Sequence, residues 1–194
     1  MMNDSARRAL EALMEGNARF REGRPAHPRR DGRRRAETVS GQKPFAAIVS
    51  CADSRVPPEI LFDQGIGDLF VVRAAGHALD AAGLGSLEYA ASHLGVPLVL
   101  VLGHTRCGAV EAVLAGGETC GNVRFVVEAI RPAVERARRL GGDIRRNAVR
   151  ENVASAVSLV SSCEPVLDRL VAAGSTAVVG AVYDVESGAV EIVG

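Results

Sequence analysis

The sequence predicts an α/β fold, a single domain whose mostly parallel central sheet is flanked by helices, with an N-terminal helical arm. Short, fully apolar segments such as PFAAIVS and PLVLVLGH are typical of strands buried on both faces. These segments alternate with helix-like segments, which indicates crossover connections between parallel strands. The length of 194 residues fits one domain, with an N-terminal helix and basic arm over 1–40 and the α/β core over 41–194.

The first expected element is an amphipathic helix over residues 3–22. Apolar residues recur there near helical spacing, at Leu10, Leu13 and Phe20, and a glycine then ends the pattern. A basic, proline-punctuated segment follows, RPAHPRRDGRRRAE over residues 24–37. We interpret it as a solvated surface arm, with the wrapping of a neighbouring subunit as the alternative.

The core is expected to alternate strands with helices, as apolar runs and glycine or proline breaks alternate along the chain. The closing segment reads as a strand and a hairpin that turns at Glu186, Ser187 and Gly188. The expected elements before it are strands over 44–50, 68–76 and 97–104, helices over 85–95 and 108–117, and helical segments over 122–140 and about 143–172 with breaks near Gly141 and Pro165.

Composition excludes several classes of function. The net charge is zero, aromatic residues make up 4% and tryptophan is absent, so neither a nucleic-acid nor an anionic membrane partner is expected. No apolar run reaches the roughly 18 residues of a membrane span, and no signal peptide is recognised. We therefore expect a cytoplasmic protein, whose four cysteines are metal ligands or free thiols.

Two strand ends carry a metal-type motif. Cys51 ends the first apolar strand in VSCADSR, and His104 and Cys107 follow the third in VLGHTRCGA. Two thiolates and one imidazole suit zinc, and the carboxyl ends of parallel strands meet at one edge of a sheet. Each motif taken alone also fits a buried cysteine or histidine of the core. Their joint position favours a zinc site with three protein ligands.

Asp53 and Arg55 control the fourth ligand position in this interpretation. Zinc with two thiolates is formally neutral, and coordination by Asp53 would add a negative charge and block water. Arg55 competes for the same carboxylate through a charge-assisted pair. The sequence leaves open whether Asp53 binds the metal or pairs with Arg55 at rest.

The two motifs resemble the signatures of the β-class carbonic anhydrases. CADSR at 51–55 and GHTRCGA at 103–109 match them, and EGNARF, SLEYAASHLGV and VVGAVYDVESGAV match supporting stretches. The resemblance covers most of the chain in order and is weak in the basic arm and over about 117–175. It implies an α/β fold, a homodimer or homotetramer, and one Zn²⁺ per chain.

The resemblance also implies reversible hydration of carbon dioxide to bicarbonate by zinc-hydroxide attack. Cys51, His104 and Cys107 match the zinc ligands, and Asp53 and Arg55 match a gating dyad in which Asp53 becomes a fourth ligand in the closed form. Further positions match substrate-side residues. They are Gln42, which in part of the family reaches a partner subunit's site, with Phe70, Ala75, Tyr89 and Gly108, and we add Val56 to the expected lining.

Two departures from the family pattern stand out. The stretch RAAGH replaces the common R-N-A-G-N, which introduces His77; we interpret His77 as a surface or interface histidine. Ile48 stands where one branch of the family has a tryptophan of a non-catalytic bicarbonate pocket, so that pocket is not expected. Cys120 and Cys163 are interpreted as ordinary thiols, with Cys163 in the core on a helix.

Three other functions remain open at the level of sequence. A hydrolase of carbonyl sulfide or carbon disulfide would use nearly the same site. A non-catalytic zinc protein would keep Asp53 permanently on the metal, although Arg55 would then have no purpose. A thiol redox protein is disfavoured because the chain has no Cys-x-x-Cys motif.

Overall fold

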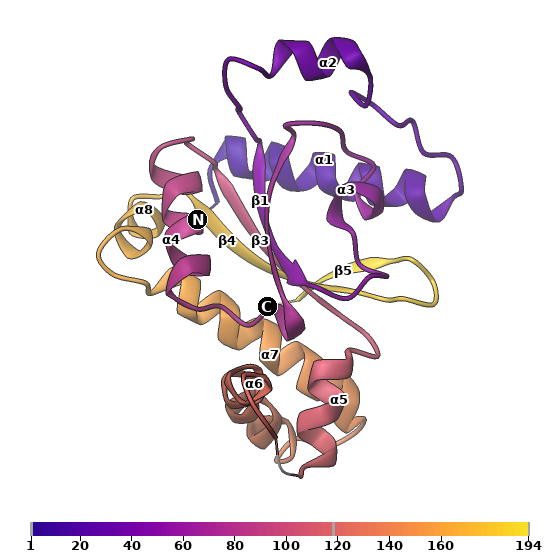
Figure 1. Cartoon of the computed structure of the whole chain (residues 1–194), viewed down its shortest axis with the longest axis vertical. Coiled ribbons are helices and arrows are strands. Elements are labelled where there is room, and N and C mark those ends of the chain that lie inside the picture. The colour runs from indigo at the N-terminus through magenta and orange to yellow at the C-terminus, as the bar shows by residue number, and fades with distance from the viewer. Residues whose placement is uncertain (1, 118, 194) are drawn as a thin grey trace.

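The computed structural model describes residues 2–117 and 119–193, which build a five-stranded sheet (Figure 1). The strand order is β2-β1-β3-β4-β5, and all neighbours pair in parallel except β4 and β5. The mostly parallel sheet predicted from the sequence is confirmed. The strands are β1 (Ala46–Cys51), β2 (Leu69–Ala74), β3 (Leu98–His104), β4 (Ala177–Tyr183) and β5 (Val190–Val193).

Helices cover both faces of the sheet because side chains alternate along the buried strands. Ala47, Val49 and Cys51 point into one core cluster, whereas Ala46 and Ile48 point into the other. The second face is covered by α1 (Asp4–Arg21) and α3 (Pro58–Leu61). The first is covered by α4 (Ala81–Ser92), α5 (Gly108–Ala115), α6 (Val123–Ala137), α7 (Ile144–Ser161) and α8 (Leu167–Ala172).

The carboxyl ends of β1 and β3 lie side by side, and this positions the predicted site. The two strands are hydrogen-bonded in parallel, with Ser50 opposite Leu102. Cys51 is the last residue of β1 and His104 the last of β3, and α5 starts shortly after His104. The sheet edge nearest α5 therefore collects the motif residues.

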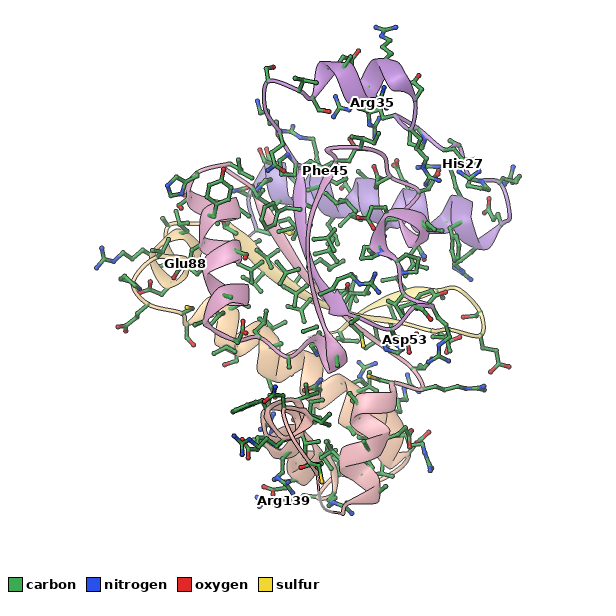
Figure 2. The ribbon with its side chains drawn as sticks, in the orientation of Figure 1. His27, Arg35, Phe45, Asp53, Glu88 and Arg139 are labelled. Carbon is green, nitrogen blue, oxygen red and sulfur yellow. The ribbon has the colours of Figure 1, made fainter. Side chains whose placement is uncertain are left out.

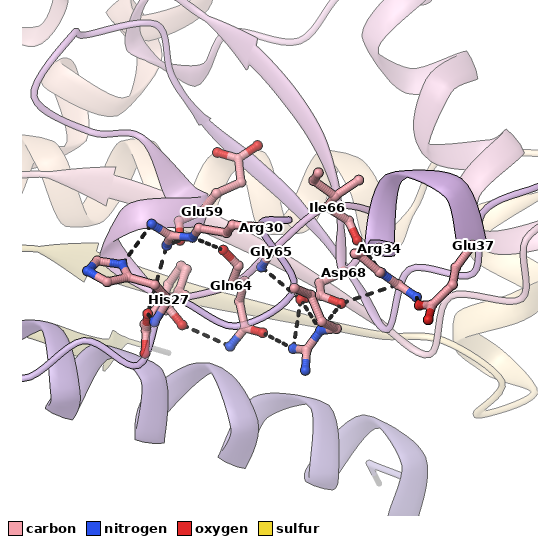
Figure 3. A network of polar contacts seen from close by, with 12 residues as sticks. His27, Arg30, Arg34, Glu37, Glu59, Gln64, Gly65, Ile66 and Asp68 are labelled. Atoms are coloured by element: carbon pink, nitrogen blue, oxygen red, sulfur yellow. Dashed lines mark hydrogen bonds and ion pairs between the residues drawn. The ribbon is translucent and has the colours of Figure 1, made fainter. Parts of the chain in front are cut away.

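The basic arm lies on the surface, as expected, since most of its residues are exposed. It contains a short helix, α2 (Gly32–Glu37), at the end of the molecule opposite α5 and α6 (Figure 1). Arg29 Nε donates to both carboxylate oxygens of Asp68 at 2.7 Å, and Gly65 N donates to Asp68 Oδ2 at 2.8 Å. Figure 3 shows this network around Gln64 and Asp68. The buried carboxylate of Asp68, in the loop that precedes β2, therefore helps to hold the arm in place.

The boundaries of other elements differ from the expectations for local reasons. Helix α4 begins at Ala81, earlier than expected, because the Asp80 carboxylate accepts a hydrogen bond from Gly83 N and caps the helix. The segment between α7 and α8 contains Pro165, as expected, but Cys163 lies in this connection and is only partly buried. The assignment of Cys163 to a helix is therefore wrong. None of the helices within the described residues has the length and apolarity to cross a bilayer.

Candidate metal centre

Three secondary-structure elements deliver the candidate ligands. Cys51 ends β1, where its register partner is Ala74 of β2, and His104 ends β3 opposite Tyr183 of β4. The chain then makes a tight turn in which Arg106 adopts φ 56°, and Cys107 becomes the N-cap of α5. Ligands from two neighbouring strands and a helix start can meet only when the sheet has formed.

The side chains of Cys51, His104 and Cys107 converge on one point. Their two sulfurs and a ring nitrogen all lie within 4.8 Å of one another, and all three residues are buried. This spacing allows a single ion to contact all three atoms, and thiolate and imidazole ligands are those that zinc prefers. Three ligands of a tetrahedral ion leave a fourth position for water or substrate.

The His104 ring is prepared to act as a ligand. Its Nδ1 lies 2.9 Å from the carbonyl oxygen of Thr105, so Nδ1 carries the proton and donates. The lone pair is then on Nε2, which is buried and has no hydrogen-bond partner among the described residues. An unpaired buried acceptor costs stability unless something binds it. The residues present therefore fit a metal ion at Nε2.

The surroundings of the Cys51 sulfur favour its ionised, thiolate form. The Cys107 thiol and the His104 ring lower the pKa of Cys51 below the usual range of a thiol, against the effect of burial. Backbone N–H groups contribute as well: Gly76 N donates to Cys51 Sγ at 3.2 Å and Asp53 N at 3.4 Å. The nearby Cys51 sulfur and burial raise the pKa of Cys107. A divalent cation would allow both sulfurs to ionise.

Asp53 pairs with Arg55 in this structure. Arg55 donates to the carboxylate from its backbone N at 2.9 Å, from Nε at 2.9 Å and from Nη2 at 2.7 Å, which holds the pKa of Asp53 well below its usual range. Asp53 Oδ2 lies 3.9 Å from His104 Nε2. Figure 2 shows Asp53 at the end of the sheet nearest α5. The carboxylate is thus beside the candidate ligands and is held by the arginine.

Comparisons with known proteins show which family the chain belongs to. The family model for carbonic anhydrase matches residues 46–190. The chain belongs to the carbonic anhydrase family. It is 46% identical to carbonic anhydrase 2 of Mycobacterium tuberculosis over 97% of this chain and 93% of that one. It is 43% identical to the carbonic anhydrase of Mycolicibacterium smegmatis, covering 99% and 95% of the two chains. The β-carbonic anhydrase of Coccomyxa has a TM-score of 0.74 at 29% identity, over 94% of this chain and 85% of that one.

The substrate-side residues expected from the resemblance to the carbonic anhydrases fall into two groups. Ala75 follows β2 directly and Gly108 follows Cys107, so both lie beside the ligands, and both are exposed. Phe70 is four residues before Ala74 on β2, or about 13 Å along the strand. Its ring contacts Tyr89, with ring centroids 6.4 Å apart.

Gln42 and Val56 do not face the metal centre of their own chain. Gln42 precedes β1 and Cys51 ends it, so the two residues lie at opposite ends of a strand of about 20 Å. Val56 has no exposed surface and belongs to the core cluster on the face covered by α1. Val56 is thus a core residue.

Sequence reasoning missed or misplaced several residues around this carbonic anhydrase centre. His77 is 3% exposed within a single chain, so its interpretation as a surface or interface histidine is wrong. Its neighbour Gly76 supplies an N–H to Cys51, and the Arg73 side chain donates to the carbonyl oxygens of Cys51 at 3.0 Å and Asp53 at 2.7 Å. The sequence feature that could have pointed to Arg73 is its position at the end of the apolar segment LFVVR, where a charged residue follows a predicted strand.

Proposed function

We propose that this chain catalyses the reversible hydration of carbon dioxide with one zinc ion held by Cys51, His104 and Cys107. The observation that carries the proposal is the buried His104 Nε2, which has no hydrogen-bond partner in the described part of the chain and lies within 4.8 Å of two cysteine sulfurs. Membership of the carbonic anhydrase family supports the reaction. When bound, zinc supplies the Lewis acidity that makes water a nucleophile near neutral pH.

Arg55 keeps Asp53 available for catalysis in this proposal. Three N–H groups of Arg55 fix the carboxylate, and Arg55 Nη2 also donates to the Arg106 carbonyl oxygen at 3.1 Å. That second contact ties the dyad to the turn that carries Cys107. Asp53 Oδ2 then accepts a hydrogen bond from the attacking water and orients it, and it remains ionised because Arg55 lowers its pKa. Arg55 prevents Asp53 from taking the fourth ligand position.

The substrate-side residues divide between two copies of the chain in the proposed homodimer. Ala75 and the Gly108 backbone border the centre of their own chain. Gln42 and Phe70 are too far from it, and Tyr89 contacts Phe70, so we assign all three to the site of a second copy. Support comes from β2, which is an edge strand with half-buried side chains, and from Tyr89, which is 46% exposed. Edge strands readily pair with another chain.

A cytoplasmic location belongs to the same proposal. All four cysteines are free, although Cys51 and Cys107 have neighbouring sulfurs. Thiols persist as ligands in a reducing compartment, whereas an oxidising one would favour a disulfide between them.

The experiment that tests the function is stopped-flow carbon dioxide hydration at pH 7 and pH 9, on protein whose zinc content has been quantified. We expect fast turnover that rises with pH, because two thiolates donate more charge than imidazoles and make the bound water less acidic. A Cys107→Ser variant should lose both zinc and rate. No turnover at either pH with one zinc per chain would reject the proposal, and the same sample would then be tested on carbonyl sulfide and carbon disulfide.

A second measurement tests the dimer. Sedimentation of the full chain should give at least twice the monomer mass, and Gln42→Ala should lower the hydration rate without loss of zinc. A fully active monomer would contradict the assignment of Gln42, Phe70 and Tyr89 to a partner's site.

A further inference from the structure

The turn after β2 touches the Cys51 sulfur through its backbone. It is the short helical segment Ala75–His77, and Gly76 N donates to Cys51 Sγ at 3.2 Å. Gly76 has φ 59°, and a Cβ there would lie 2.5 Å from Ile130 Cδ1 and 3.0 Å from Ala109 Cβ. Only glycine fits between these neighbours with this backbone conformation. The turn is therefore fixed by α5 and α6 on one side.

Asn152, on α7, holds the same turn from another side. Its amide nitrogen donates to the Gly76 carbonyl oxygen at 3.0 Å and lies 3.0 Å from His77 Nε2. Asn152 is 5% exposed, so it has little access to water as an alternative partner. An amide NH₂ group has two hydrogens, and these two contacts use both of them. With both hydrogens used in this way, His77 Nε2 is the acceptor and the ring proton lies on Nδ1, which is buried and has no hydrogen-bond partner among the described residues.

His77 remains an acceptor at neutral pH. Burial lowers its pKa to about 4, so the ring is neutral when the enzyme works. The ring also packs against the strand that carries His104: a Cβ at Gly103 would lie 3.6 Å from His77 Cε1 and 2.5 Å from Val153 Cγ2. Gly103 thus makes room for α7 and for His77 beside β3.

We propose that Asn152 is a positioning residue for the metal-site thiolate, which keeps the Gly76 N–H directed at Cys51 Sγ through its bonds to Gly76 and His77. The inference rests on the proposed function, since it takes Cys51 as a zinc ligand. A hydrogen bond to a ligating sulfur withdraws charge from it and fixes its direction. Changes in such outer partners commonly cost 10- to 100-fold in metal affinity. Of the two backbone donors on Cys51 Sγ, Gly76 N is the nearer.

The competing explanation is that Asn152 merely satisfies a buried carbonyl oxygen. Both explanations predict that its loss destabilises the fold, so stability alone does not separate them. A positioning role also predicts that the electronic character of the metal–sulfur bond changes. Cobalt in place of zinc reports this through its thiolate charge-transfer absorption.

The test compares the full-length wild-type chain with Asn152→Leu, which keeps the size of the side chain and removes both hydrogen bonds. Val160→Ala is the control, because Val160 is fully buried on the same helix but lies about 12 Å further along the helix axis than Asn152. We expect Asn152→Leu to move the charge-transfer band to longer wavelength and to weaken zinc binding about 10-fold in a chelator competition. Val160→Ala should leave both unchanged. A lower melting temperature of Asn152→Leu with a wild-type band and affinity would overturn the proposal.

A second variant keeps the test decisive if Asn152→Leu does not fold. His77→Phe removes the acceptor on the ring and leaves the bond from Asn152 to the Gly76 carbonyl oxygen. We expect a smaller band shift in the same direction, and an unmoved band would overturn the positioning role. The failure of the proposed function would look different. If the metal site itself is wrong, the wild-type chain will show no thiolate band with cobalt, and if only the reaction is wrong, the band will be present and the stopped-flow assay will show no turnover.

Discussion

Asp53 and Asp63 both pair with an arginine, but the surroundings of the two carboxylates differ. The Asp63 side chain has no exposed surface and accepts hydrogen bonds from Arg19 Nε at 2.7 Å, Ala26 N at 2.8 Å and His27 N at 2.9 Å. Asp53 is held by one residue, Arg55, whose side chain is 51% exposed. Next to Asp53 lies His104 Nε2, which has no partner among the described residues.

The difference distinguishes a carboxylate that stabilises the fold, Asp63, from one that lies beside a candidate metal site, Asp53. A buried charge whose acceptors are all used fixes the chain around it, and breaking it is costly. Asp63 and Asp68 do this for the basic arm. Polar atoms with unused capacity are costly unless a ligand takes them. At the ends of β1 and β3 the structure collects such atoms, and this is where the proposed zinc binds. If this distinction holds, substitutions at the metal centre should change activity, and substitutions at Asp63 should change stability.

The largest effect is expected from His104→Gln. This change removes the free Nε2 and preserves much of the side-chain volume. Zinc supplies several kcal/mol of transition-state stabilisation, and about 4 kcal/mol corresponds to roughly 10³-fold, so the hydration rate should fall by about that factor. Metal analysis should show the parallel loss of zinc. A variant that keeps its rate without zinc would break the distinction between the two regions.

Asp63→Asn should lower the stability of the fold and leave the hydration rate unchanged. We expect the free energy of unfolding to fall by about 3 kcal/mol, because the change removes the charge that Arg19 and two backbone N–H groups bind. For a chain of this size the melting temperature then falls by about 6 to 12 °C. The rate per folded molecule should stay at the wild-type level. Glu22→Gln is the control: it removes an acid from the exposed Arg24–Glu22 pair and should change stability by less than about 1 kcal/mol. An equal loss in both variants would show that burial of Asp63 does not matter.

The contrast also explains what sequence reasoning could predict. The candidate zinc ligands can be predicted because Cys51 and His104 each end an apolar strand and Cys107 follows His104 by three residues. Parallel strands bring their carboxyl ends together regardless of what lies between them in the sequence. The strand and helix pattern follows from the same apolar periodicity. Local chemistry was sufficient for Cys51, His104 and Cys107, and for the proximity of Asp53 and Arg55.

The features that were missed depend on contacts between distant segments. The sequence predicts a surface arm but not its path, because the acids that pair with its arginines, Asp63 and Asp68, lie in a later loop. His77 looks like a surface residue until Asn152 of α7 packs against it. The residues near His77 in the sequence do not predict its contact with Asn152. Long-range pairing of polar groups is visible only in the folded chain.

Arg55→Ala tests whether the pairing of Asp53 with Arg55 serves activity and not stability. Asp53 would lose the two side-chain N–H donors, Nε and Nη2, and keep only the backbone N–H of residue 55. Its carboxylate would then be free to compete for the fourth ligand position near His104 Nε2. We expect the hydration rate to fall about 30-fold with zinc retained, equivalent to roughly 2 kcal/mol. Stability should change by less than about 1 kcal/mol because the Arg55 side chain is half exposed. Arg55→Lys keeps the charge without the paired N–H geometry and should have an intermediate rate. Loss of zinc in Arg55→Ala would contradict the gating role.

The smallest expected effect is the loss, at acidic pH, of the stability that Asp63 contributes. Burial opposes ionisation of Asp63, but Arg19 and the N–H groups of Ala26 and His27 outweigh it and hold the pKa of Asp63 below its ordinary value. The unfolded chain therefore binds the proton more readily than the folded chain in the acidic range. The stabilisation is complete well above the unfolded pKa of about 3.9 and is lost as the pH falls towards the folded pKa. Urea unfolding of wild type and Asp63→Asn should give the same difference in free energy at pH 7 and pH 6, and a smaller difference at pH 3.5. A difference that stays constant at pH 3.5 would mean that shape rather than charge holds the arm, and Asp63 would then resemble a neutral hydrogen-bonding residue more than it resembles Asp53.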